Sequence, residues 1–99
     1  MLIILGTVRA PPDRIERARG PMRSMVEGSR AEEGCLDYAY AEDLLDPGLF
    51  HVIERWRDQA ALTAHFATDH MAAWRATWRD LAIHDRRLFR YEAGEGEAF

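Results

Sequence analysis

The sequence predicts an α+β protein of the ferredoxin-like, split βαβ type, in which the elements follow the order βαββαβ. Residues typical of strands (apolar, aromatic and β-branched) are concentrated in four segments, 2–9, 35–42, 49–57 and 83–92. Apolar residues at helical spacing fill two further segments, 13–31 and 59–78. The chain has 99 residues, which suits one domain and leaves too little for two cores. We expect residues 1–93 to form the domain and residues 94–99 to be a loose polar tail.

Prolines separate the first strand from the first helix. Leu2 to Val8 is apolar, and Pro11 and Pro12 follow shortly after it. Asp13 is placed to cap the helix. Because the apolar phase of 13–31 continues across Gly20-Pro21, we expect one helix that is kinked or briefly broken there. Gly34 is expected to end it in the left-handed conformation that glycine allows.

The next two strands form a predicted hairpin. Segment 35–42 places Leu36, Tyr38 and Tyr40 on one face, and Asp46-Pro47-Gly48 is a turn signal before segment 49–57. Asp58 then caps a helix whose residues at four-residue steps are apolar or aromatic. Thr68-Asp69 offers a second cap, which would divide this stretch into two short helices. Segment 83–92 is the last strand.

Strand patterns predict that both faces of the sheet are buried. Residues Leu2 to Leu5 are apolar on both faces of the first strand, and in the third strand Leu49 and Ile53 point opposite to Phe50 and Val52. Two helices cover only one face. We therefore expect a homodimer whose sheets pack face to face, a dimeric α/β barrel. A monomer with an exposed sheet is the alternative.

Composition and charge exclude several classes of function. The formal net charge is −4, which disfavours binding to nucleic acid. All 13 basic residues are arginine, so a Schiff-base lysine is excluded. The longest apolar run, at residues 1–5, is too short for a membrane span, and no basic segment precedes it as in a signal peptide. A single cysteine, Cys35, fits a reducing compartment, and we expect a cytoplasmic protein.

The histidines do not form a familiar metal motif. His65 and His70 are five residues apart, so on one continuous helix they diverge by about 140°. A break at Thr68 would bring them together. No H-x-x-x-H, C-x-x-C or glycine-rich phosphate loop is present, and we expect no bound metal, flavin or haem.

Two titratable residues fall in apolar patterns. His70 is in phase with Leu62, Phe66 and Trp74, which predicts a desolvated, neutral imidazole that could act as a base. The alternative is a buried histidine bonded to a backbone carbonyl. Glu54 falls on the inward face of its strand, where a carboxylate needs either an arginine partner or a proton.

Three segments carry a family resemblance: 29–38, with Glu32-Glu33-Gly34-Cys35 and Tyr38; 50–56, with Glu54-Arg55-Trp56; and 60–70, with His65 and His70. In this order they resemble the antibiotic biosynthesis monooxygenase family, whose pattern runs E-x-G-C-x-x-Y, E-x-W and H-x-x-x-x-H. The resemblance implies a dimeric ferredoxin-like barrel. It also implies oxidation of a small aromatic quinol, phenol or anthrone by O₂ without a cofactor.

The resemblance and the helical phase together select the expected site. We expect His65 and His70 to be catalytic. The substrate pocket is expected to be formed by Tyr38, Tyr40, Glu54, Trp56, Phe66, Trp74 and Trp78. For most of the tryptophans and tyrosines a core position is the simpler interpretation.

Relatives with the same fold leave two alternatives open. One is an isomerase of a small phosphorylated sugar, for which Arg75 or Arg79 could hold the phosphate. The other is a binding module without catalysis. Haem degradation is disfavoured, because Arg75 stands where that branch of the fold carries its iron-ligating histidine.

Overall fold

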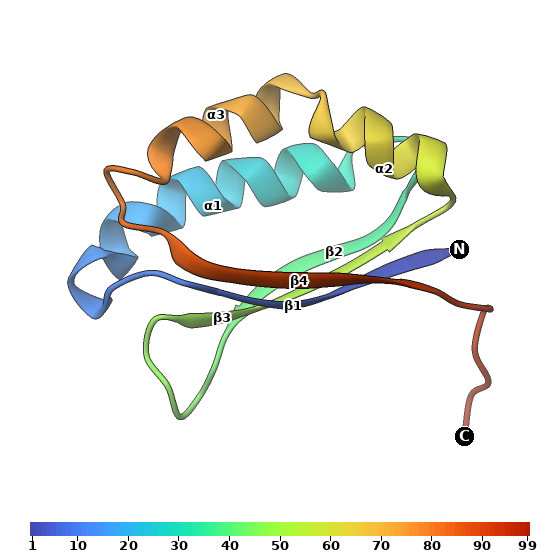
Figure 1. The fold of residues 1–99 in the computed structure, drawn as a ribbon, viewed down its shortest axis with the longest axis horizontal. Coiled ribbons are helices and arrows are strands. Elements are labelled where there is room, and N and C mark those ends of the chain that lie inside the picture. Colours follow the sequence, from blue (N-terminus) through green and yellow to red (C-terminus); the bar gives the residue numbers. More distant parts are fainter.

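The computed structural model describes residues 1–99 and shows a four-stranded antiparallel sheet with helices on one face (Figure 1). The strand order is β2-β3-β1-β4, which confirms the predicted ferredoxin-like fold. None of the helices has the length and apolar character that a membrane crossing requires. The elements are β1 (Leu2–Arg9), the 3₁₀ turn η1 (Pro12–Arg14), α1 (Ile15–Arg30), β2 (Cys35–Glu42), β3 (Leu49–Trp56), α2 (Gln59–Phe66), α3 (Asp69–Thr77) and β4 (His84–Glu92).

Both ends of the first helix differ from the prediction. Asp13 does not cap it, because Pro12 starts a 3₁₀ turn that contains Asp13, and α1 begins only at Ile15 without a side-chain cap. The helix then continues through Pro21 to Arg30. Its C-cap is Ala31, so Gly34 does not end the helix in a left-handed conformation. Gly34 instead allows close packing, since a Cβ there would collide with the Cβ of Ala61 at the start of α2.

The hairpin of β2 and β3 is confirmed, but Leu36 lies on the opposite face of β2 from the one predicted. A register shift between Cys35 and Asp37 inserts an extra residue into β2. Cys35 therefore pairs with Trp56, whereas Leu36 is 50% exposed and does not share a face with Tyr38. Alternation counted along the sequence has no signal for such a bulge. The turn ends at Gly48, whose φ of +89° is the left-handed conformation that glycine favours.

Two short helices, not one, follow β3. The carboxylate of Asp58 accepts a hydrogen bond from the backbone N–H of Ala61, and Thr68 Oγ1 accepts one from Met71 N–H, so each helix has its own cap. The break resets the helical phase. The four-residue series therefore does not form one buried stripe, and Phe66, the last residue of α2, is itself 45% exposed.

The core lies between the helices and the sheet. β1 contributes Leu2, Ile4 and Val8, and β3 contributes Val52 and Trp56, while the helices cover them with Met22, Met25, Leu62, Met71 and Trp74. The inward alternation predicted for β3 is confirmed, because Phe50, Val52, Glu54 and Trp56 are all buried.

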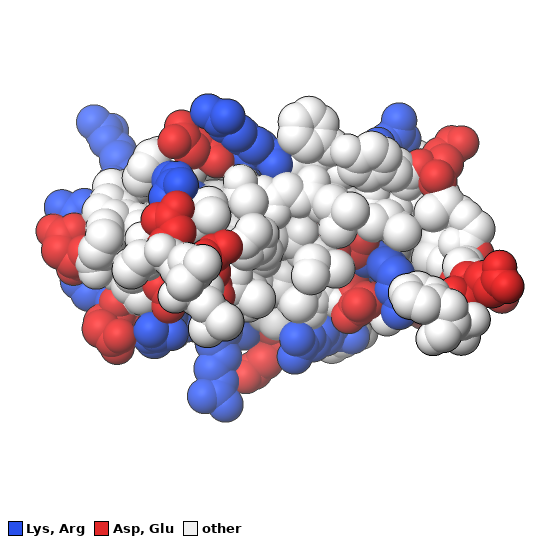
Figure 2. Space-filling view, turned by 90° about the horizontal axis from the view of Figure 1, so that it is seen from below, with Lys and Arg blue, Asp and Glu red and all other residues white.

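The outer face of the sheet carries a row of uncharged residues. Ala39, Ile53, Leu5 and Phe89 are neighbours across β2, β3, β1 and β4. Leu5, Ile53 and Phe89 are 44%, 40% and 60% exposed. Figure 2, seen from below the sheet, shows a face that is largely uncharged at its centre, with most charged side chains toward the rim. The strand patterns predicted that both faces are buried; in the single chain the helices bury one face, and the other exposes this uncharged row.

Candidate functional site

Glu54 is a buried carboxyl group in the middle of the sheet. Strand alternation directs it toward the helices, between Ile4 of β1 and Tyr38 of β2 in the register. The residue is 4% exposed, and Trp56 Nε1 donates a hydrogen bond of 2.9 Å to its Oε1. Burial raises the pKa of Glu54 to about 7, against the opposing effects of the Trp56 hydrogen bond and the charge of Arg86. The carboxyl group therefore exchanges its proton near neutral pH.

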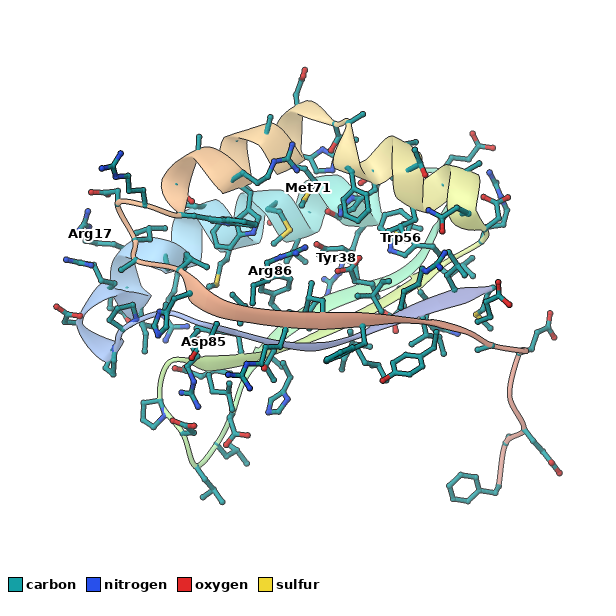
Figure 3. All side chains as sticks on the ribbon, viewed as in Figure 1. Arg17, Tyr38, Trp56, Met71, Asp85 and Arg86 are labelled. Carbon is teal, nitrogen blue, oxygen red and sulfur yellow. The ribbon has the colours of Figure 1, made fainter.

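A pocket of about 310 Å³ lies beside this carboxyl group, between α2 and β4. Its residues are Ile4, Glu54, Gln59, Leu62, Phe66, Arg86, Leu88, Phe89 and Arg90. The volume suits a small aromatic molecule. Arg86 lies with its guanidinium 5.5 Å from the centre of the Trp78 ring, and Figure 3 shows it between the sheet and the helices. The pocket combines apolar walls, one buried acid and two cations.

Glu32 joins the two histidines in a second cluster. Its Oε2 lies 2.6 Å from His65 Nδ1 and 2.8 Å from His70 Nε2. The three residues come from different segments: His65 from α2, His70 from α3, and Glu32 from the turn after α1. The break at Thr68 thus brings the histidines together, as the sequence allowed. Their ligand atoms lie within 4.8 Å of one another, so this is the group that could hold a metal ion.

The histidines differ in burial, and here the sequence interpretation is corrected. His65, not His70, is the desolvated one: it is 1% exposed, with its ring centre 4.5 Å from that of Trp56 and 5.4 Å from that of Tyr38. Desolvation lowers the pKa of His65, while the adjacent Glu32 opposes this shift. The side chain of His70 is 25% exposed, and its partner is the Glu32 carboxylate in place of a backbone carbonyl.

The predicted aromatic residues do not all meet in one pocket. Tyr38 and Trp56 surround His65, while Tyr40, Trp74 and Trp78 form a second edge-to-face group. Of the nine predicted site residues, only Glu54 and Phe66 line the 310 Å³ pocket. Tyr38, Trp56 and Trp74 are at most 2% exposed and belong to the core. Burial raises the pKa of Tyr40 to about 12, so this phenol stays protonated at neutral pH.

Three residues of these clusters were missed from the sequence, although each carried a signal. Glu32 is the first letter of the E-x-G-C motif. Arg86 and Arg90 share a face of β4 with Leu88, by simple alternation. The arginines expected to hold a phosphate, Arg75 and Arg79, do not line the pocket. Arg75 instead donates a hydrogen bond to the carbonyl oxygen of Phe66.

Comparisons with known proteins agree with this fold. The strand order and the single helical layer define an α+β domain of the ferredoxin-like class. The family model described as antibiotic biosynthesis monooxygenase matches residues 1–77, and the chain belongs to this family. A solved structure from Deinococcus radiodurans, provisionally described as an antibiotic biosynthesis monooxygenase, has a TM-score of 0.91 and 30% identity. The superposition covers 100% of this chain and 98% of that one.

Two further relatives match over most of the chain. YcnE of Bacillus subtilis, whose name assigns it provisionally to the monooxygenases, is 28% identical over 96% of this chain and 100% of its own length. An uncharacterized protein of Synechocystis sp., sll1783, is 29% identical over 95% of this chain, and the matched region spans 64% of that protein. A general monooxygenase-like role follows from the family.

Proposed function

We propose that this protein is a cofactor-independent monooxygenase that oxidises a small quinol, phenol or anthrone with O₂ in the pocket between α2 and β4. One observation carries the proposal: Glu54 is a buried carboxyl group with a pKa raised to about 7, and it lines an otherwise mainly apolar pocket. A carboxylate whose pKa lies near the working pH is well matched to accept a proton from an acidic C–H or O–H group.

The proposed reaction begins with this proton transfer. The carboxylate of Glu54 takes a proton from the substrate, and Arg86 stabilises the anion that results. The electron-rich anion reduces O₂, and a carbon–oxygen bond forms as a peroxide. The O–O bond then breaks, one oxygen atom stays on carbon as a carbonyl group, and the other leaves as water. For an anthrone, a CH₂ group and O₂ thereby become C=O and H₂O.

The pocket residues account for the remaining requirements. Ile4, Leu62, Phe66 and Leu88 provide the apolar surface that would hold an aromatic ring and exclude water. The charged and titratable groups that act on Glu54 are Arg86 from β4, Cys35, Tyr38 and Tyr40 from β2, and Glu32 after α1. Of these, the guanidinium of Arg86 favours the ionised carboxylate and Glu32 opposes it.

His70 and His65 remain the alternative proton acceptors. They match the histidine pair of the family, but neither lines the pocket. If His70 takes the proton, His70→Ala loses turnover by roughly 10²–10⁴-fold while Glu54→Gln keeps it. If Glu54 takes the proton, the two variants show the reverse pattern. Phe66 contacts both regions, since it lines the pocket and its ring centre lies 5.6 Å from that of His65.

An isomerase of a phosphorylated sugar is the second candidate. The observation in its favour is the pair of cations in the pocket, Arg86 and Arg90, which could hold a phosphate group. Such an enzyme would turn over without oxygen. A binding module without catalysis would retain its ligand and show no turnover.

We also propose that the protein is a homodimer. The sheet face that the helices leave uncovered presents Leu5, Ile53, Phe89 and Tyr91 at 40–60% exposure, and a second copy of the same face would bury them. Phe89 belongs both to this face and to the lining of the pocket, so the proposed interface adjoins the pocket.

An oxygen electrode provides the first test. The wild-type protein and Glu54→Gln are supplied with a panel of small hydroquinones, phenols and anthrones, in buffer with a chelator. The proposal predicts oxygen consumption by the wild type alone. Turnover of a phosphorylated sugar under nitrogen, with no oxygen consumption on the panel, would favour the isomerase.

A further inference from the structure

The carboxylate of Glu32 lacks a permanent positive partner. Its side chain is 14% exposed, and the only groups within ion-pair distance are His65 and His70, which are charged only when protonated. The other carboxylates with little exposure differ from it: Glu54 keeps a proton up to about pH 7, Glu42, at 30% side-chain exposure, lies 3.7 Å from Arg19, and Asp43, at 28%, contacts one histidine and not two. A nearly buried carboxylate that contacts two imidazoles and no guanidinium would be stabilised by binding a cation.

The side chains of Glu32, His65 and His70 point toward one common point. Both imidazoles direct a ring nitrogen to the same carboxylate oxygen, at 2.6 and 2.8 Å. With Glu32 ionised, both contacts are N–H donations to the carboxylate, and the two protons lie between the three groups. Gly28 fixes one side of the cluster, because a Cβ at this position would lie 2.8 Å from His70 Cγ.

We propose that Glu32, His65 and His70 bind one divalent transition-metal ion, which takes the place of the two protons between them. The expectation of no metal rested on the missing ligand motifs and on the divergence of the two histidines along a continuous helix. The break at Thr68 brings the histidines together, and Glu32, from the turn after α1, supplies a third ligand that spacing along one helix does not reveal. The inference is independent of the proposed oxygenation, since none of the three residues lines the pocket beside Glu54.

The donor set selects the class of ion. Two imidazole nitrogens and one carboxylate oxygen suit zinc, copper or nickel, whereas magnesium and calcium prefer sites made of oxygen ligands alone. Zinc binds histidine and carboxylate at about 2.0–2.2 Å, so tetrahedral ligands lie roughly 3.4 Å apart. The two nitrogen–oxygen distances, 2.6 and 2.8 Å, are shorter than this, so the Glu32 side chain must move away by roughly 0.6–0.8 Å. Entry is through His70, whose side chain is the most exposed of the three.

Zinc binding tests the proposal directly. The wild-type protein is dialysed against micromolar ZnCl₂ and its zinc content measured, with MgCl₂ in excess. We expect one zinc ion per chain, and at least tenfold weaker binding in His70→Ala and in Glu32→Gln. His51→Ala is the matched control: His51 Nε2 lies 2.7 Å from Asp43 Oδ2, a histidine–carboxylate pair without a third ligand. This control should keep full binding.

Tryptophan fluorescence adds a readout of location. The ring of Trp56 lies 4.5 Å from that of His65, so Cu²⁺ in the proposed site should quench its emission at one equivalent. The quenching should be lost in His70→Ala and kept in His51→Ala, with circular dichroism showing that both variants are folded. Zinc binding that is absent at 100 µM, or that falls equally in His51→Ala, would overturn the proposal.

Discussion

The indole of Trp56 donates a hydrogen bond of 2.9 Å to the carboxyl group of Glu54, two residues before it on β3. Strand alternation puts both side chains on the same face, and the hydrogen bond fixes the orientation of one carboxyl oxygen. No protein group hydrogen-bonds the other oxygen, and Glu54 lines the pocket. The hydrogen bond from Trp56 therefore holds the carboxyl group of Glu54 in a fixed orientation at the apolar surface of the pocket. Three predictions depend on this carboxyl group.

Removing the acid should abolish turnover without unfolding the protein. Glu54→Gln keeps the shape of the side chain and its contact with Trp56 but cannot accept a proton. We expect kcat on an active quinol or anthrone to fall by roughly 10²–10⁴-fold with little change in KM. Glu33→Gln is the control, because that side chain is 93% exposed. Undiminished turnover in Glu54→Gln would exclude Glu54 as the base.

The rate should rise with pH. If the ionised carboxylate is the base, kcat/KM of the wild type increases through an apparent pKa of about 7 and is constant above it. The variant Arg86→Gln should shift this midpoint upward, because the guanidinium favours the ionised form of Glu54. A pH–rate profile of both proteins checks this. A midpoint that does not move would argue against Glu54 as the titrating group.

Glu54 should also make the wild type less stable as the pH rises. Its pKa is about 7 in the folded protein and 4.5 ordinarily, so the folded chain holds one more proton between these values. The stability that this proton provides is complete below pH 4.5 and is lost as the pH rises toward 7. The loss is worth up to roughly 3 kcal/mol. Thermal unfolding at several pH values should show that the stability of Glu54→Gln rises relative to that of the wild type between pH 4.5 and 7. If the stabilities of the two proteins changed in parallel with pH, the prediction would be wrong.

The dimer should depend on the uncharged row of the sheet. Leu5 lies between Ile53 and Phe89 on the outer face, so Leu5→Glu places a charge at the centre of the proposed interface. Analytical ultracentrifugation should show a dimer for the wild type and a monomer of 11.4 kDa for this variant. Thr63→Glu, on the exposed surface of α2, should remain dimeric. A monomeric wild type at micromolar concentration would contradict the proposal.

Gly28 should be required for the position of His70. Gly28→Ala brings a Cβ to 2.8 Å from His70 Cγ, so either the imidazole or the helix must move. We expect a loss of about 1–3 kcal/mol in stability. Gly20→Ala is the control within α1, since no atom lies within 4 Å of a Cβ there beyond its immediate neighbours, and it should lose much less. Equal unfolding midpoints would show that His70 accommodates the change.

Much of the fold and part of the site follow from the sequence alone. Period-two alternation is a local property, and it predicted correctly that Glu54 faces inward on the same side of β3 as Trp56. The caps Asp58 and Thr68 are equally local, because each acts within three residues of its own position. The order of helices and strands along the chain and the apolar residues Leu5 and Ile53 on the outer face of the sheet were predictable for the same reason.

Tertiary structure decided which residues form a site. The histidine with the lowered pKa is His65, because its ring is buried in the core. The break at Thr68 lets His70 meet Glu32, which is 38 residues away in the sequence. Likewise, Arg86 approaches Glu54 only because β4 lies beside β1 at the edge of the sheet. Burial and charge act through space, so a pattern of spacing along the chain identifies the candidates but cannot decide which of them meet.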